Sequence, residues 1–216
     1  MISLPKKLKV GGHVYKVKTL KYFKDQRDLV GLHSEHDRVI TVAIQYSSLD
    51  RNIQQLLETL LHESIHAIDS VYCERSFSET IVEKLSEALY CVLAANDLFL
   101  GTNKVIERIN ILGTMFKIIH PYEFETMVEE GSCSTTAYNE CEFRIADRIE
   151  DISISRTNLE ECIIRMVCGV IVSSSWFSEV DLENFKIFAF SQGLYQFLKE
   201  NKFDELVRKC YNERNV

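Results

Sequence analysis

The sequence has little proline and no long apolar run. Two of its 216 residues are proline, and no segment is low in complexity or rich in proline and glycine, so its composition is that of a globular chain. The most apolar run, residues 162–172, contains Arg165 and is too short to span a bilayer. The first residues have no apolar stretch of signal-peptide length. We therefore predict a cytoplasmic protein without a membrane partner.

Excess positive charge and a disulfide framework are also missing. The formal net charge is −7, which disfavours a general affinity for nucleic acid. The sequence shows no arrangement of Arg or Lys with aromatic residues of the kind that forms a nucleic-acid platform. The seven cysteines are odd in number and form no C-x-x-C motif. We expect mostly buried thiols in a reducing compartment, and we expect no nucleic-acid partner.

Patterns of apolar residues place strands ahead of helices in the first half. Residues 10–17 and 38–43 alternate as strands do, and a helix is expected from about Asp50, a candidate N-cap, through His66. A polar loop separates this helix from a second helix that ends near Asn96. The pattern predicts an α+β fold with a short antiparallel sheet, whose second strand is a candidate edge for an extended peptide.

The same order of elements returns in the second half. The matching segments are 111–118 and 10–17, 142–146 and 38–42, 158–164 and 52–57, and 191–198 and 86–93. Each unit spans roughly one hundred residues, a common size for a small domain. We therefore predict a duplication with domains at residues 1–101 and 102–216. The alignment sets Cys168, Gly169 and Val172 opposite His62, Glu63 and His66, so the second copy is expected to lack metal ligands.

One five-residue motif carries definite chemistry. Residues 62–66 read His-Glu-Ser-Ile-His, and residues four apart in a helix lie one above the other. His62 and His66 can therefore present two imidazoles to one Zn²⁺, while Glu63 is placed to act on the attacking water. Because Leu57, Leu60 and Ile68 project to the other side of this helix, the histidines do not lie on its apolar face.

A third ligand is expected from the second helix, which carries Glu79, Glu83 and Glu87 on one face. Ser76 and Glu79 fit a capping box, which gives Glu79 a structural role at the helix start. Glu83 lies a full turn inside the helix, so it is our first choice as the metal ligand, with Glu79 second. Glu87 is expected to orient a ligand, and Asp69 either to orient His66 or to be a fourth ligand.

Residues 60–68 and 82–90 together make the chain recognisable. They resemble the corresponding segments of small zinc metallopeptidases encoded by phages and mobile elements, within the broader gluzincin pattern. The resemblance covers a little under half of the chain. It implies a zincin-like domain, His62, His66 and Glu83 as Zn²⁺ ligands, and Glu63 as catalytic base. It also implies the host cytoplasm as the location if a phage encodes the protein. The second copy departs from the minimal form of that family.

These features predict a zinc-dependent metallopeptidase that hydrolyses peptide bonds of a protein or peptide substrate. Three protein ligands leave Zn²⁺ an open position, which is the catalytic arrangement. The alternative is a non-catalytic binding module for a host or phage protein, with a structural metal or none. Glu63 favours the enzyme, because a structural site has no use for that carboxylate. Tyr90 is a weak candidate for stabilising the oxyanion.

Overall fold

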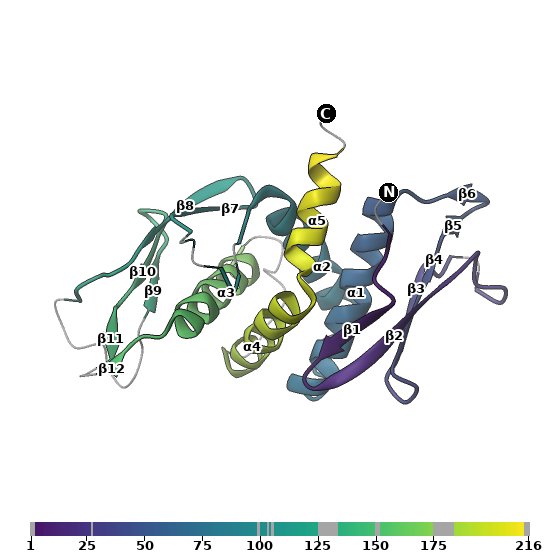
Figure 1. Cartoon of the computed structure of the whole chain (residues 1–216), viewed down its shortest axis with the longest axis horizontal. Coiled ribbons are helices and arrows are strands. Elements are labelled where there is room, and N and C mark those ends of the chain that lie inside the picture. The colour runs from purple at the N-terminus through teal and green to yellow at the C-terminus, as the bar shows by residue number, and fades with distance from the viewer. Residues whose placement is uncertain are drawn as a thin grey trace.

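A layer of helices lies between two small sheets in the computed structural model of the chain (Figure 1). The structure describes residues 3–26, 28–98, 100–102, 104, 106–124, 134–149, 152–174 and 184–213. The predicted mixed α+β class is confirmed. None of the helices in the described ranges is both long and apolar enough to cross a membrane.

The first sheet is built on a tight hairpin. Its strands are β1 (Lys7–Val10), β2 (His13–Leu20), β3 (Gly31–Ser34) and β4 (Val39–Ala43). The two-residue turn between β1 and β2 is Gly11-Gly12, and both glycines have positive φ angles, 53° and 80°. Such φ values suit the mirror-image turns that join antiparallel strands.

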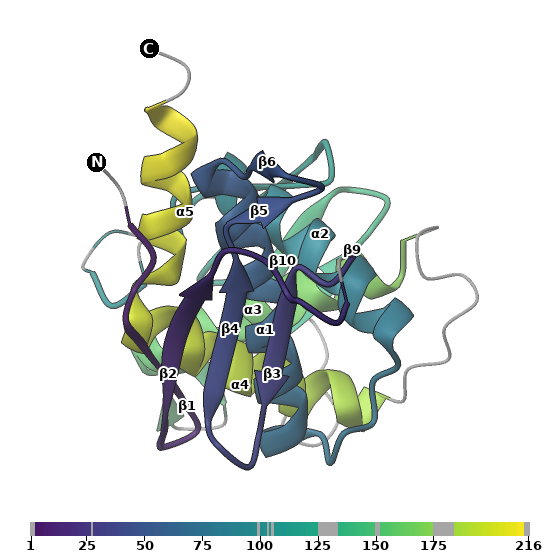
Figure 2. The ribbon, with the colours of Figure 1, turned by 90° about the vertical axis from the view of Figure 1, so that its right-hand side faces the viewer.

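The strand order β1-β2-β4-β3 corrects two predictions. After β2 the chain crosses to the far edge, forms β3, and returns as β4 between them. As a result β4 is antiparallel to β3 but parallel to β2, so the sheet is mixed and not antiparallel. The peptide-binding edge predicted at residues 38–43 is also wrong, because β4 is an interior strand and the edge strands are β1 and β3 (Figure 2).

The two helices of the first half are α1 (Ile53–Tyr72) and α2 (Glu79–Ala95). Asn52 caps α1 in a reciprocal capping box with Gln55. The predicted cap, Asp50, instead lies in the short pair β5 (Gln45–Tyr46) and β6 (Leu49–Asp50), where its carboxylate accepts a hydrogen bond from Gln45 at 2.7 Å. The helix therefore begins later than predicted, because the side chain of Asn52, and not that of Asp50, caps its first turn.

The second half repeats this plan. Its strands have the order β7-β8-β10-β9, again with a parallel pair in the middle, β8 and β10. The elements are β7 (Arg108–Ile111), β8 (Thr114–Ile119), β9 (Ser134–Ala137), β10 (Glu142–Ile145), β11 (Arg148–Ile149), β12 (Ile152–Ser153), α3 (Arg156–Val172) and α4 (Asn184–Asn201). A further helix, α5 (Phe203–Asn212), follows, and the described residues of the first half contain no third helix to match it.

The helix caps set the register between the halves. Asn52 caps α1 and Ser155 caps α3, so Arg165 corresponds to His62, and Gly169 to His66. The match predicted from sequence, which set Cys168 opposite His62, is displaced by about one helical turn. Apolar residues recur at that spacing in both helices, which is why the shifted register also fitted. In either register the second half lacks the histidines.

The two halves share one buried core. A single cluster of buried apolar residues runs through both, from Leu8 and Ile65 to Phe143 and Phe203. Helix α4 packs on α1 and on β1, and α5 packs on α1 and α2. The Asn201 side chain also bonds both the N–H and the C=O of Lys9 on β1. The halves that meet near residue 101 therefore share one core, and their division into two domains stays a prediction.

Candidate metal centre

Two imidazoles and one carboxylate meet between α1 and the start of α2. Nε2 of His62 lies 2.9 Å from Oε1 of Glu79, and Nε2 of His66 lies 3.2 Å from Oε2 of the same residue. All three ligand atoms fall within 4.8 Å of one another. The helical spacing of the histidines delivers this arrangement, since their rings lie one turn apart on the same face of α1 with centroids 5.0 Å apart.

The third group is Glu79, the second choice from sequence. Ser78, not Ser76, is the N-cap of α2, and its hydroxyl accepts a hydrogen bond from the Ile81 N–H. Glu79 is therefore the first residue of the helix and takes no part in the capping box expected from sequence. Its carboxylate is instead available to both histidines. Glu83 is exposed and lies outside this group, so the geometry favours Glu79 over Glu83.

Asp69 holds the loop that brings Glu79 into place. Its buried carboxylate accepts hydrogen bonds from the backbone N–H groups of Ser76 and Phe77, at 3.1 and 3.2 Å. Burial raises the pKa of Asp69, and these two hydrogen bonds oppose the rise. Asp69 also acts on His66 electrostatically, but it is not in the cluster of ligand atoms. Its role is to fix the turn from α1 into α2.

Ser86 orients His62, a contact that the sequence did not suggest. The Ser86 hydroxyl donates to the Glu83 carbonyl at 2.8 Å and lies 3.4 Å from Nδ1 of His62. Because the hydroxyl proton is used in the first bond, the oxygen would accept from Nδ1–H of His62 once its Nε2 is bound to a metal ion. That contact leaves Nε2 for the ligand side of the ring, which is how metal-bound histidines are usually positioned.

Glu63 lies beside the cluster, against the edge strand β3. The residue is 7% exposed, and the His33 backbone hydrogen bonds to its carboxylate. Burial, reinforced by the Glu79 carboxylate, raises the pKa of Glu63 to about 8. A carboxyl group whose pKa lies near neutrality is suited to general acid–base work.

A glycine makes room for this glutamate. A Cβ atom on Gly31 would lie 2.2 Å from Oε1 of Glu63 and 2.7 Å from Cγ2 of Thr59. Real side chains do not approach so closely, so the absence of a side chain at Gly31 lets β3 pack against α1. The sequence pattern did not predict β3, and this packing was therefore not foreseen.

His33, on β3, also belongs to this region. Its ring is parallel to that of His66 at a centroid distance of 6.5 Å and also contacts Tyr15. Burial, followed by the charge of His66, lowers the pKa of His33 to about 4. No motif spacing links His33 to His66 in the sequence, so topology alone brings them together.

Glu87 lies further along α2, near Glu58 of α1. Burial, followed by the Glu87 carboxylate, raises the pKa of Glu58 on α1, so Glu87 and Glu58 are neighbours. Among the described residues, no hydrogen bond or ion pair joins Glu87 to either histidine or to Glu79, so its role in orienting a ligand stays a prediction.

The three side chains could hold a metal ion, and imidazole and carboxylate are ligand types that Zn²⁺ accepts. Imidazole nitrogen and carboxylate oxygen bind Zn²⁺ at about 2.0–2.2 Å, so donor atoms around a tetrahedral ion are separated by roughly 3.3 Å. The measured 2.9 and 3.2 Å are close to this value. A carboxylate only accepts hydrogen bonds, so both histidines must present Nε2 protons to Glu79. A metal ion would replace these protons.

Comparisons with protein-family models, curated proteins and solved structures return no match to this chain. The resemblance to small zinc metallopeptidases therefore rests on the motif residues alone and stays a prediction.

Proposed function

We propose that the protein is a zinc-dependent metallopeptidase, with His62, His66 and Glu79 as ligands and Glu63 as general base. The observation that carries the proposal is that the Nε2 atoms of His62 and His66 converge on the Glu79 carboxylate, at 2.9 and 3.2 Å. The helix that bears the two histidines also bears the buried Glu63. Three protein donors are the number that catalytic zinc sites use.

Bound Zn²⁺ supplies Lewis acidity and lowers the pKa of water toward neutrality. Glu63 takes a proton from the attacking water and passes it to the leaving amine. The position of Glu63 supports this role, because it follows His62 on α1 and lies close enough to Glu79 to interact with it electrostatically. Ser86 keeps His62 oriented, and Asp69 keeps Glu79 at the start of α2.

The substrate of this proposed enzyme is an extended segment of a protein or peptide. Strand β3 is at the open end of the strand order, and an edge strand offers unpaired backbone groups to an added strand. Because the backbone of His33 on this strand also bonds Glu63, a peptide along β3 passes beside the proposed base.

We further propose that the second half is a degenerate copy of a zincin-like domain. The support is the repeated strand order, including the central parallel pair. In the cap-based register Arg165 and Gly169 replace the two histidines. Loss of the ligands in one copy leaves hydrolysis to the first half.

The test compares zinc-loaded wild-type protein with Glu63→Gln on a library of quenched fluorescent peptides. The variant keeps the size of the side chain and removes the base, so we expect a rate about 10²–10⁴-fold lower with unchanged zinc content. Glu58→Gln, on the same helix, is the matched control and should behave as wild type. Equal rates for wild type and Glu63→Gln would refute the role of Glu63. Zinc-loaded protein that cleaves nothing would favour the non-catalytic binding module.

A further inference from the structure

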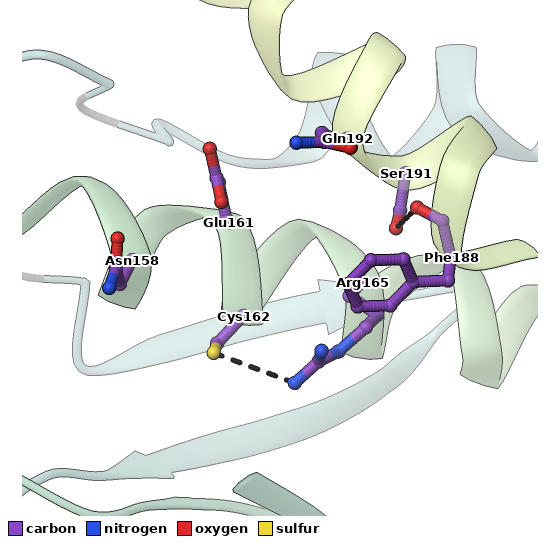
Figure 3. A pocket seen from close by; sticks show the side chains of 7 residues that line it. All are labelled: Asn158, Glu161, Cys162, Arg165, Phe188, Ser191 and Gln192. Carbon is purple, nitrogen blue, oxygen red and sulfur yellow. Dashed lines mark hydrogen bonds between the residues drawn. The ribbon is translucent and has the colours of Figure 1, made fainter. Parts of the chain in front are cut away.

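The second half contains a pocket at the place that corresponds to the metal centre. It lies between α3 and α4, as the histidines lie between α1 and α2, and it has a volume of about 160 Å³. Arg165, the counterpart of His62, lines it together with Ser191, the counterpart of Ser86 (Figure 3). Ser191 also repeats a local contact of Ser86, since its hydroxyl donates to the carbonyl three residues earlier, that of Phe188.

Arg165 brings a positive charge to this pocket. Its Nη2 donates to the Ser134 hydroxyl at 2.8 Å and contacts the Cys162 sulfur at 3.6 Å. The guanidinium also lies over the Phe188 ring, 5.3 Å from its centroid. These contacts fix the group in position, and among the ion pairs of the described residues none includes Arg165. A fixed guanidinium with remaining N–H donors is the usual partner of a carboxylate.

Glu161 brings a negative charge to the same pocket. It stands one helical turn before Arg165, an arrangement in which opposite charges commonly pair. Yet within the described part of the chain these two side chains form no ion pair with each other. In Figure 3 Glu161 lies on the side of Gln192, whereas Arg165 lies on the side of Cys162. Lys199, which acts on Glu161 electrostatically, makes its contacts with Tyr195 and Glu160 instead.

We propose that this pocket binds a small zwitterion, a free α-amino acid, whose carboxylate meets Arg165 and whose ammonium meets Glu161. Both side chains line the same pocket and leave α3 one helical turn apart, so a single small molecule that carries both charges can meet the two. The volume supports the same size class, because pockets for larger ligands begin at about 300 Å³. The Gln192 amide and the Phe188 ring offer further polar and apolar contacts.

The test is calorimetric titration of the full chain with the standard free amino acids, after a thermal-shift screen identifies the tightest. Two derivatives of that amino acid follow, the N-acetyl form without the ammonium and the amide without the carboxylate. Charge-assisted hydrogen bonds contribute about 1.5–3 kcal/mol, so each derivative should bind about 10–100-fold more weakly. Glu161→Gln should weaken the free amino acid and leave the N-acetyl form unchanged.

Arg165→Gln should remove the preference for the carboxylate, and Lys117→Gln, an exposed change on β8, is the matched control. If Arg165→Gln does not fold, the proposal is still tested by the binding of the two derivatives to wild-type protein and by the Glu161→Gln variant. The proposal is overturned if no amino acid binds, if both derivatives bind as tightly as the free amino acid, or if inorganic phosphate alone binds. It does not depend on zinc, so metal-free protein should give the same result.

Discussion

Glu63 is a buried carboxyl group between α1 and β3, next to Glu79. Burial and the Glu79 carboxylate raise its pKa and so favour its protonated form. The ligands around it are less buried, with side-chain exposures of 20% for His62 and 26% for His66. The cluster thus combines a buried carboxyl group with imidazoles that solvent can reach.

This difference predicts how the stability of the metal-free protein depends on pH. The pKa of Glu63 rises from 4.5 to about 8 on folding, so the folded state holds a proton that the unfolded chain has released. Stability from this group is fully present below pH 4.5 and is lost as the pH rises through 8. We therefore expect the urea midpoint of chelator-treated wild type to fall between pH 5 and pH 8 by more than that of Glu63→Gln.

Wild type and Glu63→Gln share the other groups with shifted pKa values. Examples are Asp204, whose pKa burial raises to about 6, and His33, whose pKa is lowered to about 4. The difference between the two midpoint curves therefore isolates Glu63. If both proteins lose the same amount between pH 5 and pH 8, Glu63 is not protonated in the folded state as described.

At the scale of single residues, the sequence was sufficient for the part of the site that lies on one helix. His62, Glu63 and His66 share α1, so their relative placement follows from helical geometry alone. The third group depended on where α2 begins. A start at Ser78 makes Glu79 the first helical residue, and the choice between two nearby serines as cap lies beyond the accuracy of pattern analysis.

At the scale of elements, the contact between β3 and α1 determines where Glu63 lies. We expect Gly31→Ala to displace the Glu63 carboxylate, since the added Cβ would lie 2.2 Å from Oε1. A displacement of about 1 Å in a catalytic group can cost on the order of 10²-fold in rate. Hydrolysis should fall by that order, while zinc content stays unchanged because none of the three ligands is part of this contact.

The matched control is Gly169→Ala in α3, where a Cβ atom meets nothing within 4 Å. It should leave the hydrolysis rate as in wild type and slightly stabilise the helix. A Gly31→Ala variant that hydrolyses peptides at the wild-type rate would show that the spacing between β3 and α1 is unimportant for the base.

The elements themselves were predictable to different degrees. Long amphipathic helices such as α1 and α2 repeat a pattern over many residues, so they stand out. Strand β3 has four residues, of which Leu32 is 47% exposed, and it carries no alternation that sets it apart from a loop. The strand order depends on crossings between distant segments, which local patterns do not encode, so the parallel pairing of β2 with β4 was missed.

At the scale of the whole molecule, the two repeats depend on each other. Helix α4 approaches α1 closely at Gly193, where a Cβ atom would lie 2.6 Å from Cδ2 of Tyr72 and 2.8 Å from Cγ2 of Ile68. The Tyr72 hydroxyl also donates to the Gln196 side chain at 2.6 Å. The sequence predicted similar halves but not this shared core, because contacts between distant segments leave no periodic pattern.

We expect Gly193→Ala to lower the free energy of unfolding by about 1–3 kcal/mol, the usual cost of overpacking a core. Because the core is continuous, far-UV and near-UV circular dichroism should report one coincident transition at a lower temperature. Two separate transitions, with only the second shifted, would mean that the repeats fold independently. Gly169→Ala again serves as the control.

The central claim is that His62, His66 and Glu79 together hold a metal ion. The most direct measurement is the zinc content of protein purified without chelator, by mass spectrometry, for wild type, Glu79→Ala and Glu83→Ala. We predict about one zinc ion per chain in wild type and in Glu83→Ala, and its loss in Glu79→Ala. Loss in Glu83→Ala with retention in Glu79→Ala would contradict the assignment of the third ligand, and metal-free wild type would contradict the metal centre itself.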